Sequence, residues 1–250
     1  MSKIKSYHED KTVMTNSRFW GYMECPAAQK AKDSEDYKQE YYLPFHIGQY
    51  VEAGLIDSEV DYEEEMMYKR KNPENGKLKA FVEADEIIAN AKEMKVDFSG
   101  EHQKEINFEL DGLKWKGMID IFRDMCLDIK TTKNSIMDLD WDDTYGTKVP
   151  RYIKYHYGYQ LALYAHGTGT LDKGAGIIAL SKTAPYTVEK VKFTPETLEE
   201  FLNDIRERQQ AIFDIFEGKV KAKPCMKCDY CKEQYRMRNY TAEMHYPLKF

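Results

Sequence analysis

The stretch from residue 105 to residue 122 constrains the fold of this chain more than any other. Polar and apolar side chains alternate from Glu105 to Leu110, as they do in a half-buried strand. The dipeptide Asp111-Gly112 favours a tight hairpin turn, so the chain is expected to return as a second strand from Leu113 to Phe122. A second turn at Arg123-Asp124 then leads into a third strand from Met125 to Thr131. The centre of the chain is therefore predicted to be an antiparallel meander.

Segments with helical spacing flank this meander on both sides. A further strand pair is expected around Pro185, from Gly174 to Leu180 and from Tyr186 to Phe193. The region from Leu139 to Pro150 has no clear period and is expected to be irregular. The predicted helices are Ser17–Lys32 (capped by Thr15 or Asn16 and broken at Pro26), Phe45–Ile56, Phe81–Met94, Arg151–Ala165 and, after a capping Thr194, Pro195–Glu217. The fold class is therefore α/β (α+β), with helices around a central mixed sheet.

The composition limits the class of protein. The 250 residues suffice for one domain with a buried core, and no linker divides them, so we expect one domain over residues 1–250. The net charge of −6 is unlike that of a basic nucleic-acid coat protein. No apolar run could span a membrane, and the first residues lack the apolar core of a signal peptide. We therefore expect a cytoplasmic protein.

Two aspartates and a lysine are predicted to meet on neighbouring strands. Asp120 lies late in the second strand, while Asp128 and Lys130 point to the same face of the third because side chains alternate along a strand. Carboxylates gathered in this way need a partner, and Mg²⁺ or Mn²⁺ prefers such oxygen ligands. A metal-activated water beside an ammonium group is suited to hydrolysis of a phosphodiester. A solvated charged strand face is the alternative, which these three residues alone would favour.

Longer motifs reverse that preference. They run from Gly117 to Asp120, from Asp128 to Lys130 and from Gln160 to Tyr164, in this order. Together they closely resemble the G-x-x-D, D/E-x-K and Q-x-x-x-Y motifs of the PD-(D/E)XK nucleases, in particular the phage-type, RecE–RecB-like and lambda-exonuclease group. The family's upstream helix motif, G-x-x-x-H or an acidic equivalent, is matched by Gly48 to Glu52. The resemblance spans about residues 17–231.

The resemblance implies a restriction-endonuclease-like core and a metal-dependent DNA nuclease. It makes Asp120, Asp128 and the backbone carbonyl of Ile129 metal ligands, and Lys130 the catalytic lysine. Glu52 would add a carboxylate where many relatives have His, and an exposed helix glutamate is the alternative for it.

Gln160 and Tyr164 lie four residues apart and share one helix face, which in the family looks onto the active site and the DNA strand. Tyr157 lies one turn earlier and is a candidate third member, while a core tyrosine is the alternative for Tyr164. Basic and aromatic residues near this helix suit contact with phosphates and an unpaired strand, and each single lysine is equally explained by solubility. They are Lys133, Lys148, Arg151 and Lys154, with Tyr152, Tyr155 and Tyr157.

Three of the five cysteines, Cys225, Cys228 and Cys231, follow each other at two-residue gaps. This spacing lets one loop place thiolates around a single metal centre, with Cys25 as the candidate fourth ligand. Several exonucleases of the superfamily hold a 4Fe–4S cluster on one N-terminal and three C-terminal cysteines, and this chain resembles that plan with a shorter last gap. The segment of about residues 219–235 is then expected to pack near the N-terminal helix. Zn²⁺ and free thiols are the alternatives, and Cys126 is expected to be structural.

The leading hypothesis is an exodeoxyribonuclease that acts on linear double-stranded DNA in phage-type recombination or repair. Members of the group often act beside a single-strand annealing protein, so such a protein is an expected partner. A single strand is a second form of the DNA substrate, which the interleaved tyrosines suit. The sequence leaves the oligomeric state open between a monomer and a homo-oligomer such as a trimeric ring or a tetramer. Two other functions stay open: an iron–sulfur CRISPR-associated or repair nuclease, and an inactive DNA-binding module. The intact set of Asp120, Asp128 and Lys130 argues against the inactive module.

Overall fold

The structure is a computed structural model that describes residues 7, 10–37, 43–56, 58, 64–143 and 145–234. Residues 1–6, on which the expected lack of a signal peptide rests, and residue 235 of the expected cysteine-rich segment lie outside this part. The chain forms two compact units, Met1–Val13 with Tyr42–Ile205 and Met14–Tyr41 with Arg206–Phe250. A single domain over residues 1–250 stays a prediction.

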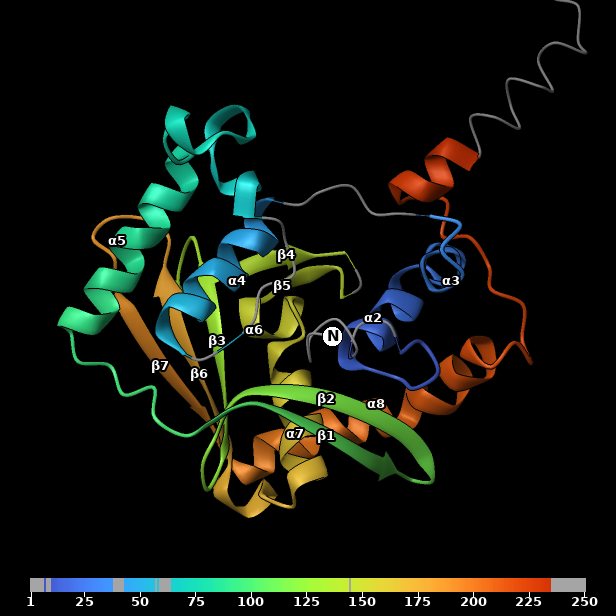
Figure 1. The fold of residues 1–250 in the computed structure, drawn as a ribbon. Coiled ribbons are helices and arrows are strands. Elements are labelled where there is room, and N and C mark those ends of the chain that lie inside the picture. The colour runs from blue at the N-terminus through green and yellow to red at the C-terminus, as the bar shows by residue number, and fades with distance from the viewer. Residues whose placement is uncertain are drawn as a thin grey trace, which may run out of the picture. The chain divides into compact units, whose positions relative to one another are not determined.

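A five-stranded sheet forms the centre of the first unit, in the order β1-β2-β3-β6-β7 (Figure 1). Its members are β1 (Glu101–Leu110), β2 (Leu113–Phe122), β3 (Cys126–Thr132), β6 (Ala175–Ser181) and β7 (Val188–Phe193). The first three are antiparallel neighbours, which confirms the predicted meander. Asp111 and Gly112 join β1 to β2 with positive φ angles of 52° and 80°, the geometry that favours Asp-Gly in a two-residue hairpin.

The sheet is mixed because β6 lies parallel to β3. A parallel neighbour requires a long crossover, and here residues 133–174 supply it. Strand β7 then pairs with β6 in antiparallel orientation, as the sequence predicts. The expected α/β class with a central mixed sheet is therefore confirmed.

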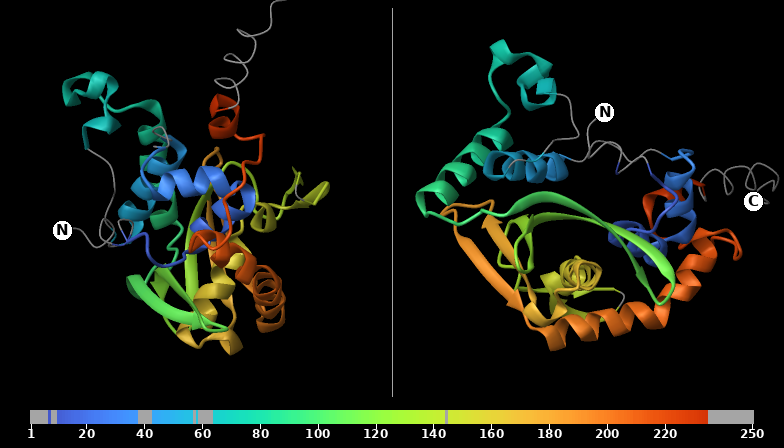
Figure 2. Two further views of the ribbon diagram at one scale, coloured as in Figure 1. Left: turned by 90° about the vertical axis from the view of Figure 1, so that its right-hand side faces the viewer. Right: turned by 60° about the horizontal axis from the view of Figure 1, so that its bottom comes forward.

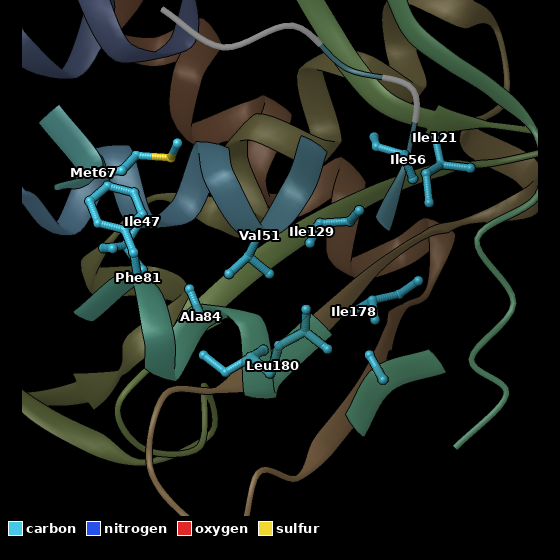
Figure 3. Close-up of a cluster of buried hydrophobic side chains, with 12 residues drawn as sticks. Ile47, Val51, Ile56, Met67, Phe81, Ala84, Ile121, Ile129, Ile178 and Leu180 are labelled. Atoms are coloured by element: carbon cyan, nitrogen blue, oxygen red, sulfur yellow. The ribbon is translucent and has the colours of Figure 1, made fainter. Parts of the chain in front are cut away.

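Helices α4 (Leu43–Leu55) and α5 (Lys79–Glu93) cover one face of the sheet (Figure 2). Val51 of α4 is fully buried and lies with Ile129 of β3 and Ala84 of α5 in one apolar cluster (Figure 3). This packing fixes α4 over β3, so the next residue, Glu52, is carried to the part of the meander that contains Asp120 and Asp128. Between the two helices, residues 64–75 form three short 3₁₀ turns: Glu64–Met67, Lys69–Lys71 and Pro73–Asn75.

The opposite face of the sheet is covered by α7 (Tyr157–Thr168), which follows the single turn α6 (Arg151–Lys154). The sequence predicts one continuous helix here, and that expectation is wrong. His156 adopts a left-handed conformation with φ of 60°, which no α-helix tolerates in its interior. The helical spacing continues across the break, so side-chain period alone does not reveal it.

The region from Leu139 to Pro150 is also more regular than expected. It forms an antiparallel hairpin of β4 (Leu139–Asp142) and β5 (Thr147–Pro150). Asp140 of β4 accepts the ion pairs of Arg151, at 3.1 Å, and Lys154, at 3.9 Å, so α6 holds the hairpin. Strands of four residues with several carboxylates lack the apolar alternation that identifies longer strands.

The second unit contains α2 (Asn16–Glu24), α3 (Pro26–Asp33) and the end of α8 (Pro195–Phe216), a helix that begins in the first unit. The Thr15 hydroxyl caps α2 by accepting the N–H of Arg18. Pro26 breaks the helix as predicted, and Cys25 stands at the break with extended backbone. Among the described helices, none has the length and apolar character needed to cross a membrane.

Candidate active site

Asp120 lies next to the last residue pair that joins β2 to β3. Strands β2 and β3 pair at Ile121–Leu127 and Phe122–Cys126, and the same register would bring Asp120 opposite Asp128. Instead, the Asp120 carboxylate accepts the backbone N–H of Ile129 at 2.7 Å. A side-chain oxygen thus takes the place of a ladder hydrogen bond, and the backbone of Ile129 is held at the centre of the site.

Asp128 is the most enclosed of these carboxylates, with 1% of its surface exposed. Its Oδ2 lies 2.7 Å from the ammonium nitrogen of Lys130, and its Oδ1 accepts a hydrogen bond of 3.1 Å from Gln160. The two aspartates and the lysine therefore share one face and one buried centre, as the sequence predicts.

Glu52 reaches the same centre from α4. Its Oε1 accepts a hydrogen bond from the amide of Gln103 on β1, a residue that the sequence analysis missed. In the β1–β2 register Gln103 falls opposite Asp120, and its φ of 50° is unusual for a strand residue other than glycine. No local pattern marks Gln103, because its role depends on the pairing of β1 with β2.

Gln160 and Tyr164 on α7 are brought together as expected: the Gln160 amide donates to the Tyr164 hydroxyl at 2.9 Å and to Asp128. The Tyr164 ring lies so close to Gly117 that a Cβ atom there would sit 2.4 Å from it. Gly117, which begins the first motif, must therefore lack a side chain to make room for Tyr164, which ends the third motif. Both motifs serve to bring α7 down onto the strands that carry the aspartates.

Ionisation of the carboxyl groups in this centre is opposed by burial and by their neighbours' charges. Burial raises the pKa of Glu52 to about 7, and the charge of Asp128 adds to the effect against that of Lys130. Burial, together with the charges of Glu52 and Asp128, raises the pKa of Asp120 well above its ordinary value. Burial also raises the pKa of Asp128. Three carboxylates therefore face a single ammonium group.

Lys130 stays charged in this environment. Burial alone would lower its pKa, but the charges of Asp128 and Asp120 outweigh burial and raise it. The ring of Tyr157 lies over the Lys130 nitrogen, 5.1 Å from its centroid. Such a contact holds an ammonium group in place without donating or accepting a proton.

The donor set fits a hard divalent cation. Glu52, Asp120 and Asp128 offer carboxylate oxygens, which Mg²⁺ and Mn²⁺ prefer, and a bound cation would favour the ionised forms that burial and mutual repulsion oppose. Oδ1 of Asp128 accepts from Gln160, while its buried Oδ2 lies 2.7 Å from the Lys130 nitrogen without a hydrogen bond, so this oxygen has lone pairs that a cation could use.

Of the other basic and aromatic candidates, some lie together near the Tyr157 ring and the rest lie elsewhere. Arg151 and Lys154 pair with Asp140 and lie on α6, next to the aromatic pair Tyr155–Tyr157. Tyr152 does not join them, because its ring packs against Phe193 and Phe201. Lys148 is exposed on β5 opposite Trp141, and the Lys133 carbonyl accepts the Thr183 hydroxyl.

The second unit contains the four cysteines as one cluster. The sulfur atoms of Cys25, Cys225, Cys228 and Cys231 all lie within 4.8 Å of one another. Cys231 lies 3.5 Å from Cys25 and 3.9 Å from Cys225. The backbone N–H of Ala27 donates to the Lys223 carbonyl and brings the cysteine-rich segment to the start of α3.

The thiols of this cluster are electrostatically distinct. Burial opposes ionisation of Cys225, but the N–H groups of Lys227 and Cys228 point at its sulfur and lower its pKa to about 6. Burial raises the pKa of Cys228 to about 12. Cys126 is fully buried in β3 beside the Thr168 hydroxyl and takes no part, as the sequence predicts.

The chain matches a family model and is similar to solved structures. Residues 15–234 match a family described as a PDDEXK-like domain of unknown function (DUF3799). A crystal structure of a protein from Eubacterium rectale, named "Putative exonuclease", has a TM-score of 0.78 and 25% sequence identity, with 93% of this chain and 92% of that chain covered. No curated protein matches the sequence.

The mixed sheet and its buried carboxylates define a PD-(D/E)XK nuclease fold. The chain belongs to the PDDEXK-like family that matches residues 15–234, and with it to the PD-(D/E)XK nuclease superfamily.

Proposed function

We propose that this protein is a metal-dependent exodeoxyribonuclease that hydrolyses phosphodiester bonds of linear double-stranded DNA. The observation that carries the proposal is the convergence of three carboxylates and Lys130 in one buried centre. The likeness to a protein named an exonuclease supports cleavage from ends. A single-strand annealing partner stays a prediction from the sequence resemblance, and the oligomeric state stays open.

The residues of the centre have separate roles in this proposal. Glu52, Asp120, Asp128 and the Ile129 carbonyl would hold Mg²⁺ or Mn²⁺, which when bound lowers the pKa of a water ligand and neutralises phosphate charge. Lys130 stays protonated and is placed to stabilise negative charge on the phosphate and to orient the attacking water. Gln160 fixes Asp128 through its amide, and Tyr164 fixes Gln160.

The test is digestion of end-labelled linear DNA with Mg²⁺ or Mn²⁺, with a covalently closed circle as a second substrate. The parent protein should release labelled nucleotides from the linear DNA and leave the circle intact. Asp128→Asn and Lys130→Ala should lose cleavage and keep DNA binding, while Lys173→Ala, an exposed lysine paired with Asp172, serves as the matched control. Equal cleavage by all four proteins would refute the assignment, and cleavage of the circle would replace the exonuclease by an endonuclease.

For the cysteine cluster we propose a single tetrahedral ion, with Zn²⁺ as the first candidate. Four thiolates at about 2.3 Å from one ion lie roughly 3.8 Å from each other, by tetrahedral geometry. The distances of 3.5 Å and 3.9 Å at Cys231 agree with that spacing. A 4Fe–4S cluster stands between its ligands and holds them farther apart.

Metal analysis of anaerobically purified protein distinguishes the two occupants. One zinc per chain and a colourless protein are expected. Four iron atoms per chain with brown colour and absorbance near 400 nm would establish the iron–sulfur cluster instead. Protein that purifies without either metal and binds none on incubation would remove the site.

A further inference from the structure

A row of aromatic rings leads from Lys130 to the surface. The Tyr157 ring lies over the Lys130 nitrogen at 5.1 Å, and the Tyr155 ring stacks on Tyr157 with centroids 5.8 Å apart and an interplanar angle of 27°. Tyr157 is half-buried, whereas Tyr155 is 48% exposed. The row therefore connects the candidate catalytic lysine to an aromatic ring that is open to solvent.

The stacking of Tyr155 on Tyr157 requires an unfavourable backbone conformation at the residue between them. Tyr155 ends α6 and Tyr157 begins α7, and the residue between them, His156, is left-handed with φ of 60°. In a continuous helix, residues two apart point about 200° away from each other and do not stack. A left-handed residue other than glycine costs roughly 1 kcal/mol or more, and such conformations gather at functional sites.

Charge at this place suits a polyanion. The Lys154 nitrogen lies 5.7 Å from the centroid of the Tyr155 ring. Lys154 and Arg151 share one acidic partner, Asp140, so two cations face a single carboxylate. A stacking ring beside surplus cations is the pairing that proteins use for single strands, because the ring takes a base and the cations take phosphates.

We propose that the DNA strand enters the active site unpaired, with a base next to the scissile phosphate stacked on Tyr155. This inference rests on the proposed nuclease function and names the form of DNA that the site takes. The separations of 5.1 Å and 5.8 Å along the row place Tyr155 roughly one or two nucleotides from a phosphate held at Lys130. Stacking is independent of base identity, so the site reads the strand without sequence preference.

The test removes the Tyr155 ring and a DNA base, separately and together, and measures whether the two losses have the same effect. Single-stranded oligonucleotides carry one abasic nucleotide at successive positions from the digested end, and the rate of each cleavage step is measured. The parent protein should slow about tenfold at one position, where the missing base would have stacked on Tyr155. Tyr155→Ala should be slower by a similar factor at every step and show no further slowing at the abasic position. Tyr155→Phe, which keeps the ring, should follow the parent.

Two controls make the outcome specific. Met94→Ala removes an equally exposed apolar side chain at the end of α5 and should follow the parent throughout. Binding measured with Ca²⁺ in place of Mg²⁺ should show that Tyr155→Ala loses about tenfold in affinity for a single strand and less for a blunt duplex.

The outcomes separate this inference from the function on which it rests. A Tyr155→Ala variant with parental rates and the parental abasic pattern overturns the stacking site, as does an equal loss of affinity for duplex and single strand. A parent protein that cleaves no DNA with either metal refutes the nuclease instead. The binding measurement still tests Tyr155 in that case.

Discussion

Glu52→Gln should stabilise the metal-free protein while it removes a carboxylate that we propose as a metal ligand. The amide has the shape of the carboxylate and keeps an oxygen to accept the hydrogen bond from Gln103. The pKa of Glu52 is about 7 in the folded protein against an ordinary value of 4.5. An acid whose pKa is raised on folding destabilises the fold above its ordinary pKa, and the cost is complete once the pH exceeds the folded value.

The size of the effect follows from the shift. A pKa difference of about 2.5 between the folded and unfolded protein lowers the free energy of unfolding by about 3 kcal/mol at pH 8. At pH 5.5 the loss is about half as large. For a protein of this length the variant should therefore melt about 6–12 °C above the parent at pH 8, with a smaller gap at pH 5.5.

The assay is thermal unfolding in EDTA at both pH values, repeated with Mn²⁺. The cation should raise the melting temperature of the parent more than that of Glu52→Gln, because the parent carries the extra carboxylate that it neutralises. The reasoning fails if the variant is no more stable than the parent at pH 8, or if the gap widens as the pH falls.

Three further outcomes are expected. Gly117→Ala should lower stability by about 1–3 kcal/mol and reduce cleavage, because the new Cβ would sit 2.4 Å from the Tyr164 ring; chemical unfolding checks it, and unchanged stability would contradict the packing. Tyr157→Ala should reduce kcat more than Tyr157→Phe, since the ring that lies over Lys130 survives in the second variant; equal loss in both would point to the hydroxyl instead. Cys231→Ser should lose the bound metal that Cys126→Ala retains, as metal analysis would show, because Cys126 lies outside the cluster.

Local sequence patterns predicted the elements that carry the site. Alternation and Asp111-Gly112 predicted the β1–β2 hairpin, which places Asp120. Pro26 predicted the helix break at which Cys25 stands. These features succeed because they depend on turn geometry and on side-chain period, which neighbouring residues determine by themselves.

Two other features have no local sequence pattern that reveals them. His156 breaks a stretch with unbroken helical spacing, and its left-handed conformation separates α6 from α7. Gln103 carries no motif and becomes part of the site only through its place opposite Asp120 and its contact with Glu52.

The sequence by itself determined which residues could do the chemistry: the order of Asp120, Asp128, Lys130 and Gln160 predicted a common centre, and the cysteine spacing predicted a cluster. Only the tertiary structure decided how the charges balance, how the Tyr155 ring is placed, and how close the sulfur atoms lie. The physical reason is that residue identity fixes what a group can donate or accept. Distance and burial, which the whole chain sets, fix its pKa and its partners.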